Sequence, residues 1–122
     1  MSYSTCNNRY SVTNLLKPKT KDYGTQCYGF ACLLQDYCFG ENTAVFEHRN
    51  FDEVRVGDHI RVDNDSDYCH SMFVIEKHDD YVVVAECNAN YKDCKIEWGR
   101  KITKEELNKS NISYYSRSYI LK

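Results

Sequence analysis

Three residues that lie far apart in the sequence could together perform nucleophilic catalysis: Cys27, His70 and Glu86. A cysteine attacks a carbonyl carbon as its thiolate, and a histidine can hold and transfer the proton. A carboxylate can fix the orientation of that imidazole and stabilise its charged form. We therefore expect a cysteine–histidine–acid hydrolytic site if the fold brings these side chains together.

Cys27 stands where the polar segment DYGTQ (22–26) meets the first turn of a predicted helix. The positive end of a helix lowers the pKa of a thiol, and its unpaired N–H groups can bind an oxyanion. Gln26 could donate a side-chain N–H to the same oxyanion. A buried structural cysteine is an equally good interpretation of this position from spacing alone.

His70 begins HSMFVIEKH (70–78), a run with strong strand character that follows a polar loop. At the mouth of a strand, a histidine can act as a general base or as the imidazolium partner of a thiolate. A lone surface histidine is the alternative. The claims of His48, His59 and His78 are weaker, because they fall in a polar connection, a strand pattern and a hairpin turn.

Glu86 and Asn88 stand at the end of the next predicted strand, YVVVAEC (81–87). A hairpin turn at residues 79–80 would bring His70 close to both of them. Either side chain could hold the imidazole through its second nitrogen. Strand alternation puts Glu86 at the edge of an otherwise apolar face, which favours Glu86, and a solvated strand-end glutamate is the alternative.

One helix and several strands must position these residues. The helix covers residues 28–39, and Gly40 is its stop signal. Its apolar face is formed by Phe30, Leu33, Leu34 and Tyr37. After a polar connection at 41–53, in which a short helical turn can form, strand character occurs at 54–62, 70–78, 81–87, 94–102 and 112–121. Thr103 and Glu106 have the spacing of a capping box. This order predicts an α+β fold with one helix and an antiparallel sheet.

The 122-residue chain fits a single domain, 1–122, with residues 1–22 as an N-terminal arm. Its formal net charge of -2 favours neither nucleic acid nor an anionic membrane as a partner. No segment has the ~20 apolar residues of a membrane span. The start has no signal-peptide pattern, which favours a cytoplasmic protein, while a signal removed before Met1 would permit secretion. The oligomeric state stays open.

The chain has seven cysteines, and this odd number favours a reduced protein. A zinc set could be drawn from Cys69, His70, Cys87 and Cys94, but it lacks the paired spacing of structural zinc sites. We therefore expect no metal and no organic cofactor, and we expect most of the thiols to be small buried residues.

The ordered set Gln26-Cys27, Gly57-Asp58, His70 and Glu86-x-Asn88 resembles the CHAP family of cysteine, histidine-dependent amidohydrolases/peptidases. These are papain-like bacterial and phage enzymes related to the NlpC-type peptidases, and the similarity covers about residues 20–102. The sequence departs from the pattern at Cys69, where glycine is common, and it has no wall-binding module.

The resemblance implies a papain-like fold with Cys27 as nucleophile, His70 as base and Glu86 or Asn88 as the orienting group. Gln26 matches the residue beside the nucleophile. It also implies peptidoglycan as substrate, cut by an amidase or endopeptidase. The alternatives are an intracellular or phage-encoded cysteine protease or deamidase that acts on a protein, and a non-catalytic interaction domain of the same fold.

Overall fold

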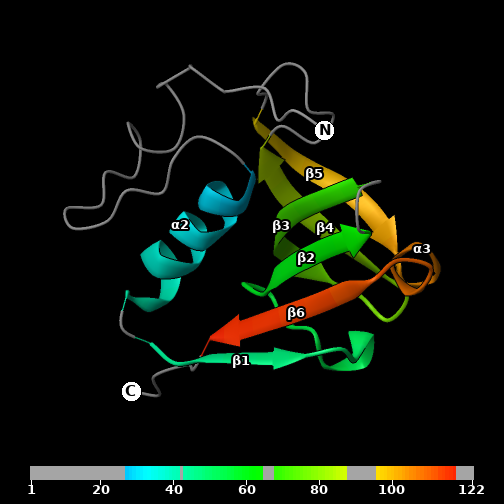
Figure 1. The fold of residues 1–122 in the computed structure, drawn as a ribbon, viewed down its shortest axis with the longest axis horizontal. Helices are drawn as coiled ribbons and strands as arrows, with labels where there is room; N and C mark the ends of the chain where they lie inside the picture. The colour runs from blue at the N-terminus through cyan, green and yellow to red at the C-terminus, as the bar shows by residue number, and fades with distance from the viewer. Residues whose placement is uncertain (1–26, 42, 65–67, 88–95, 118–122) are drawn as a thin grey trace.

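An antiparallel sheet with helices against its faces forms the part of the chain that the computed structural model describes, residues 27–41, 43–64, 68–87 and 96–117 (Figure 1). The helical elements are α2 (Cys27–Phe39), the 3₁₀ helix η1 (Phe51–Glu53) and α3 (Lys104–Asn108). The strands are β1 (Val45–His48), β2 (His59–Asn64), β3 (Tyr68–Lys77), β4 (Tyr81–Cys87), β5 (Ile96–Thr103) and β6 (Ile112–Arg117). Their order in the sheet is β1-β6-β2-β3-β4-β5. The protein is therefore α+β.

Helix α2 lies against one face of the sheet, over β3 and β4 (Figure 1). The helix contributes three apolar side chains at helical spacing and the strands contribute three more. Together they form a buried cluster of Phe30, Leu33, Leu34, Phe73, Ala85 and Cys87. Because Cys27 is the first residue of α2, this cluster holds the start of the helix beside the central strands.

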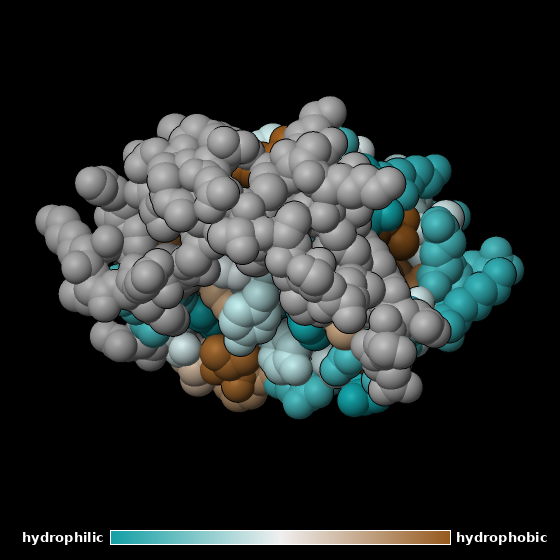
Figure 2. Space-filling model, turned by 45° about the horizontal axis from the view of Figure 1, so that its top comes forward, coloured by the Kyte–Doolittle hydropathy of each residue, from teal (hydrophilic) through white to brown (hydrophobic). Residues whose placement is uncertain are grey.

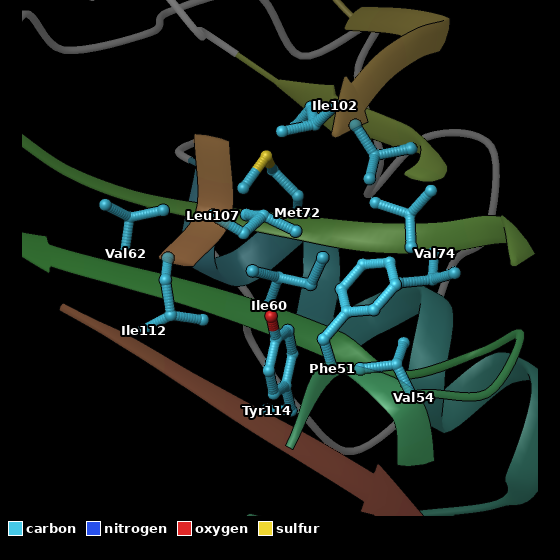
Figure 3. Close-up of a cluster of buried hydrophobic side chains, with 12 residues drawn as sticks. Phe51, Val54, Ile60, Val62, Met72, Val74, Ile102, Leu107, Ile112 and Tyr114 are labelled. Carbon is cyan, nitrogen blue, oxygen red and sulfur yellow. The ribbon is translucent and has the colours of Figure 1, made fainter. Parts of the chain in front are cut away.

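The opposite face of the sheet carries the larger core, which Figure 3 shows. Its strand residues point toward η1 and α3, which supply Phe51 and Leu107. The other members are Val54, Ile60, Val62, Met72, Val74, Val82, Val84, Ile102, Ile112 and Tyr114. Alternate residues of β3 and β4 therefore face two separate apolar layers.

The hairpin of β3 and β4 forms around the predicted turn at residues 79–80. Phe73 pairs with Ala85 and Val74 with Val84, and a bulge follows between Val74 and Glu76. The capping box at the start of α3 is also present: the Thr103 side chain accepts from the Glu106 N–H, and the Glu106 side chain accepts from the Thr103 N–H. Both predictions, the hairpin and the capping box, came from residues that are close together in the sequence, and both are confirmed.

Several boundaries differ from the expectations. The connection at 41–53 contains strand β1, whose pairing partner β6 is far away in the sequence. The segment 54–58 is a turn before β2 rather than a strand. Strand β3 begins at Tyr68, so that His70 is its third residue and not its first.

The α2 face was also predicted only in part. Tyr37 is 69% exposed, while Gln35 and Asp36 are buried beside the predicted apolar residues. Gln35 and Asp36 can be buried because their polar groups have partners: Gln35 donates hydrogen bonds to two backbone carbonyls, and Asp36 binds Arg117. Of the cysteines described, only Cys27 and Cys87 are buried, so the expectation that most thiols are buried is wrong for Cys32, Cys38 and Cys69.

The exterior mixes polar groups with small apolar areas. Figure 2 shows apolar patches between hydrophilic side chains on one face of the molecule. The large apolar and aromatic side chains that are exposed are Tyr28, Tyr37, Val45, Phe46, Val56 and Trp98. None of the helices in the described ranges is long and apolar enough to span a membrane. The predicted N-terminal arm, 1–22, lies outside these ranges.

Candidate active site

Cys27 begins α2 and is 7% exposed. Its thiol lies beside the His70 ring and the Ser71 backbone, and both affect its pKa. Burial disfavours the thiolate, but the polar groups of His70 and Ser71 and the positive charges of His70 and Arg61 outweigh burial and lower the pKa of Cys27. The N-terminus of α2 acts in the same direction. The site therefore favours a thiolate.

His70 lies in β3 with no exposed surface. Its Nε2 is 2.8 Å from Oε1 of Glu86. Since Nε2 faces the carboxylate, Nδ1 is the ring nitrogen available to the Cys27 thiol. Burial disfavours the imidazolium, but the hydrogen bond to Glu86, the neighbouring Cys27 thiol and the negative charges of both groups raise the pKa of His70 above its usual value.

Glu86 is also fully buried, next to Val84 and Val82 on the core face of β4. Burial raises the pKa of a carboxyl group, but the hydrogen bonds to His70 and Arg100 and their charges lower the pKa of Glu86 overall. These shifts favour an ionised carboxylate, which contacts Nε2 of the His70 ring. Thiol, imidazole and carboxylate form a continuous chain of contacts.

Arg100 completes this chain and was missed from sequence. Its Nε is 2.6 Å from Glu86 Oε2, and its Nη2 is 2.9 Å from Glu86 Oε1, which makes a bidentate ion pair. Nη2 also lies 3.4 Å from the sulfur of Met72. The guanidinium of Arg100 therefore binds the same carboxylate that contacts His70.

A bulge in β5 directs Arg100 to this position. Val84 pairs with Arg100 whereas Ala85 pairs with Trp98, so that Gly99 is the extra residue, at φ 110°. Simple alternation would put Trp98 and Arg100 on the same face. With the bulge, Trp98 packs edge-on against Phe30 of α2 and Arg100 reaches the opposite face. Gly99 was the only sequence signal for this arrangement.

Two predicted site residues, Gln26 and Asn88, lie outside the described residues. Among the others, the structure brings Cys27, His70 and Glu86 together. The Gly57-Asp58 motif instead connects the turn before β2 to β3: Gly57 N–H donates to Val74 O, and Val74 N–H donates to Asp58 O. Gly57 has φ 96°, and an added Cβ would collide with Phe39.

The remaining histidines have other surroundings. His48 contacts Ser116 and Asp58 at one ring nitrogen, and exposed His78 contacts Glu76. His59 is 3% exposed, and its Nε2 has no hydrogen-bond partner in the part of the chain that the structure describes. No group of three or more metal-ligating side chains occurs within the same described ranges. The zinc set considered from sequence includes Cys94, which lies outside them.

No family model, curated protein or solved structure matches the chain. The resemblance to the CHAP family therefore rests on the ordered motifs in the sequence.

Proposed function

We propose that the protein is a thiol hydrolase of amide bonds with a papain-like arrangement of nucleophile, base and acid. The contact chain from the Cys27 thiol through His70 to Glu86 carries this proposal. All three side chains are buried, and their pKa shifts favour a thiolate–imidazolium pair beside a carboxylate. This charge distribution is the one that a cysteine hydrolase needs before its substrate binds.

The reaction has two steps. The Cys27 thiolate adds to the carbonyl carbon of the amide, the carbon–nitrogen bond breaks, and His70 gives its proton to the departing amine. His70 then takes a proton from water, and the resulting hydroxide attacks the thioester. The carbon–sulfur bond breaks, the carboxylic acid leaves, and the thiolate–imidazolium pair forms again.

The start of α2 can stabilise the oxyanion of each tetrahedral intermediate. The first N–H groups of a helix have no partner within that helix, and they point away from its N-terminus. Cys27 is the first residue of α2, so its backbone N–H is one of these groups. Gln26, as in the CHAP pattern, would supply a second donor from its side chain.

The resemblance gives the cell-wall peptide as the first substrate to test. The alternative substrate is a protein, which the same chemistry would cleave or deamidate. Exposed Tyr28, directly after the nucleophile, provides an aromatic contact for a peptide of either class. Cys27 would attack both classes of substrate, and the products released would tell them apart.

The experiment combines a thiol-directed activity probe with two digests. Purified peptidoglycan and denatured casein are incubated with the wild-type chain, Cys27→Ala and Cys38→Ala, and released amines are measured. Cys38 is an exposed thiol at the far end of the same helix, which makes it the matched control. We expect probe labelling and amine release to require Cys27 alone. Equal activity of wild type and Cys27→Ala would refute the proposal, and the productive digest identifies the substrate class.

A further inference from the structure

A groove of about 470 Å³ lies between α2 and the strands β2 and β6, on the sheet face that α2 covers. Helix α2 contributes Tyr28 to its lining, β2 contributes His59 and Arg61, and β6 contributes Tyr115 and Arg117. These residues are separate from the Cys27–His70–Glu86 chain. Of these residues, Tyr28 offers a contact for a peptide and Arg61 places a charge near the Cys27 thiol, but the groove itself has no ligand assigned to it.

The groove is adjacent to the nucleophile. Tyr28 directly follows Cys27 in the helix. Arg61 Nη1 donates to Ser71 Oγ at 3.1 Å, and the backbone of Ser71 lies beside the Cys27 thiol and helps to lower its pKa. The charge of Arg61 also acts on that thiol. A substrate attacked by Cys27 would therefore extend past Arg61.

Among the residues that the structure describes, Arg61 forms no ion pair with a carboxylate. Its described contacts are the neutral hydroxyl of Ser71 and the ring of Tyr28, 5.8 Å from the guanidinium carbon. Arg117 is already bound to Asp36. The acid in the lining is Asp63, an exposed residue whose carboxylate accepts a hydrogen bond from the Cys69 thiol.

His59 adds an unused hydrogen-bonding group to this positive surface. Its ring lies 5.5 Å from the rings of both Tyr28 and Tyr115, and its buried Nε2 has no partner among the described residues. Burial, followed by the charges of Arg61 and Arg117, lowers the pKa of His59 to about 3. A neutral ring can donate one N–H without adding a charge.

We propose that this groove is a substrate subsite that binds a carboxylate, through an ion pair with Arg61 and a hydrogen bond from His59. A carboxylate matches the fork of a guanidinium and can accept further hydrogen bonds from a histidine N–H and a tyrosine hydroxyl. It also removes the cost of leaving a buried polar atom unpaired. The assignment as a subsite rests on the proposed hydrolase function, and it specifies an acidic peptide as the substrate.

Two small probes test this proposal on the full chain. N-acetylglutamate α-amide carries one carboxylate, and N-acetylglutamine α-amide is its neutral isostere. Each is titrated into protein with isotope-labelled histidine, and the ring resonances of His59 are followed by NMR. We expect the charged probe to shift them with an affinity at least about tenfold higher than the neutral one.

Arg61→Gln should abolish this preference, whereas Arg49→Gln, which removes an exposed arginine bonded to Asn111, should retain it. If Arg61→Gln does not fold, the comparison of the two probes on wild-type protein still shows whether the groove prefers a carboxylate. Equal affinities, or no response of His59 to either probe, would overturn the carboxylate site.

A second readout tests the assignment as a subsite. The charged probe should slow alkylation of Cys27 by iodoacetamide. Binding at His59 without such protection would overturn the claim that the groove is a substrate subsite. The NMR measurement needs no turnover. Failure of the hydrolase proposal and failure of the carboxylate site are therefore recognised separately.

Discussion

His59 and His70 are both almost completely buried, yet the structure drives their pKa values in opposite directions. Burial alone lowers the pKa of a histidine, and it does so at both positions. His70 has Glu86 and the Cys27 thiol as partners, which reverse the effect. His59 faces Arg61 and Arg117, which strengthen it.

The two rings also occupy opposite faces of the sheet. His59 pairs with Phe73 of the α2-side cluster and lies near Tyr28 and Tyr115, whereas His70 pairs with Val62 of the larger core. The comparison teaches that burial alone does not decide whether a histidine holds a proton: the neighbouring groups add to the effect of burial at His59 and reverse it at His70. One sheet thus holds two buried imidazoles whose pKa values are shifted in opposite directions.

The largest expected effect follows from removing the charged imidazole. His70→Gln should lower turnover by about a thousandfold or more, because neither the thiolate nor the departing amine would have its proton partner. His78→Gln, at an exposed histidine next to Glu76, is the control and should keep wild-type turnover. Steady-state kinetics with circular dichroism spectra of both variants measure this. Turnover within a few-fold of wild type in His70→Gln would remove His70 from the mechanism.

The neutral histidine should show itself in acid stability. The folded pKa of His59 is about 3, so that between about pH 7 and pH 5 the unfolded chain binds a proton that the folded chain does not. Stability therefore falls as the pH falls through this range, by ~2 kcal/mol from this residue. His70 acts with the opposite sign, because a raised folded pKa stabilises at low pH.

His59→Phe should accordingly lose less stability between the two pH values than wild type does. Urea unfolding of both proteins at about pH 7 and about pH 5 gives the difference, and the comparison cancels the carboxyl groups that titrate in both. An unchanged pH dependence in His59→Phe would show that the folded protein protonates this ring.

A smaller effect is expected from neutralising the carboxylate that holds His70. Glu86→Gln keeps the shape but cannot stabilise an imidazolium, and we expect turnover to fall by at least about tenfold, or ~1.4 kcal/mol. Asn88→Ala should mainly change stability or substrate affinity. Steady-state kinetics and thermal melts separate these effects. Wild-type turnover in Glu86→Gln together with its loss in Asn88→Ala would move the third role to Asn88.

Arg100 should have the smallest effect, because its side chain is 43% exposed and its ion pair is screened by solvent. It is a positioning residue that acts through Glu86. Arg100→Gln should lower turnover only a few-fold and should shift the alkaline limb of the pH–rate profile downward, since Glu86 then supports the imidazolium less firmly. Arg100→Lys should restore most of the profile. A change in stability without any change in the profile would mean a purely structural role.

Local patterns predicted much of the fold. Helix α2 from 3.6-residue spacing, the β3–β4 hairpin and the Thr103–Glu106 capping box each depend on residues within a short window. Strand β1 was not predicted because VFEH has little strand pattern of its own, and its pairing with β6 joins segments far apart in the sequence. Elements defined by distant partners are therefore where sequence reasoning fails.

The residues of the candidate site also fall into those that the sequence predicted and those that it did not. Cys27, His70 and Glu86 could be proposed from residue type and position, but Arg100 could not, because only the pairing of β4 with β5 brings it to Glu86. The inserted residue, Gly99, puts Trp98 and Arg100 on opposite faces, which strand alternation does not predict. Sequence also ranked His59 as a weak candidate, since a strand position says nothing about which charges will surround the ring.

The most direct test of the central claim is the pH dependence of Cys27 alkylation by iodoacetamide, read by peptide mapping, in wild type and His70→Gln. In wild type the midpoint should lie clearly below that of an ordinary thiol, ~8.5, and below that of Cys38, whose pKa is raised by burial. In His70→Gln the Cys27 midpoint should rise, because burial then acts with less opposition. The same Cys27 midpoint in both proteins would contradict the thiolate–imidazolium pair.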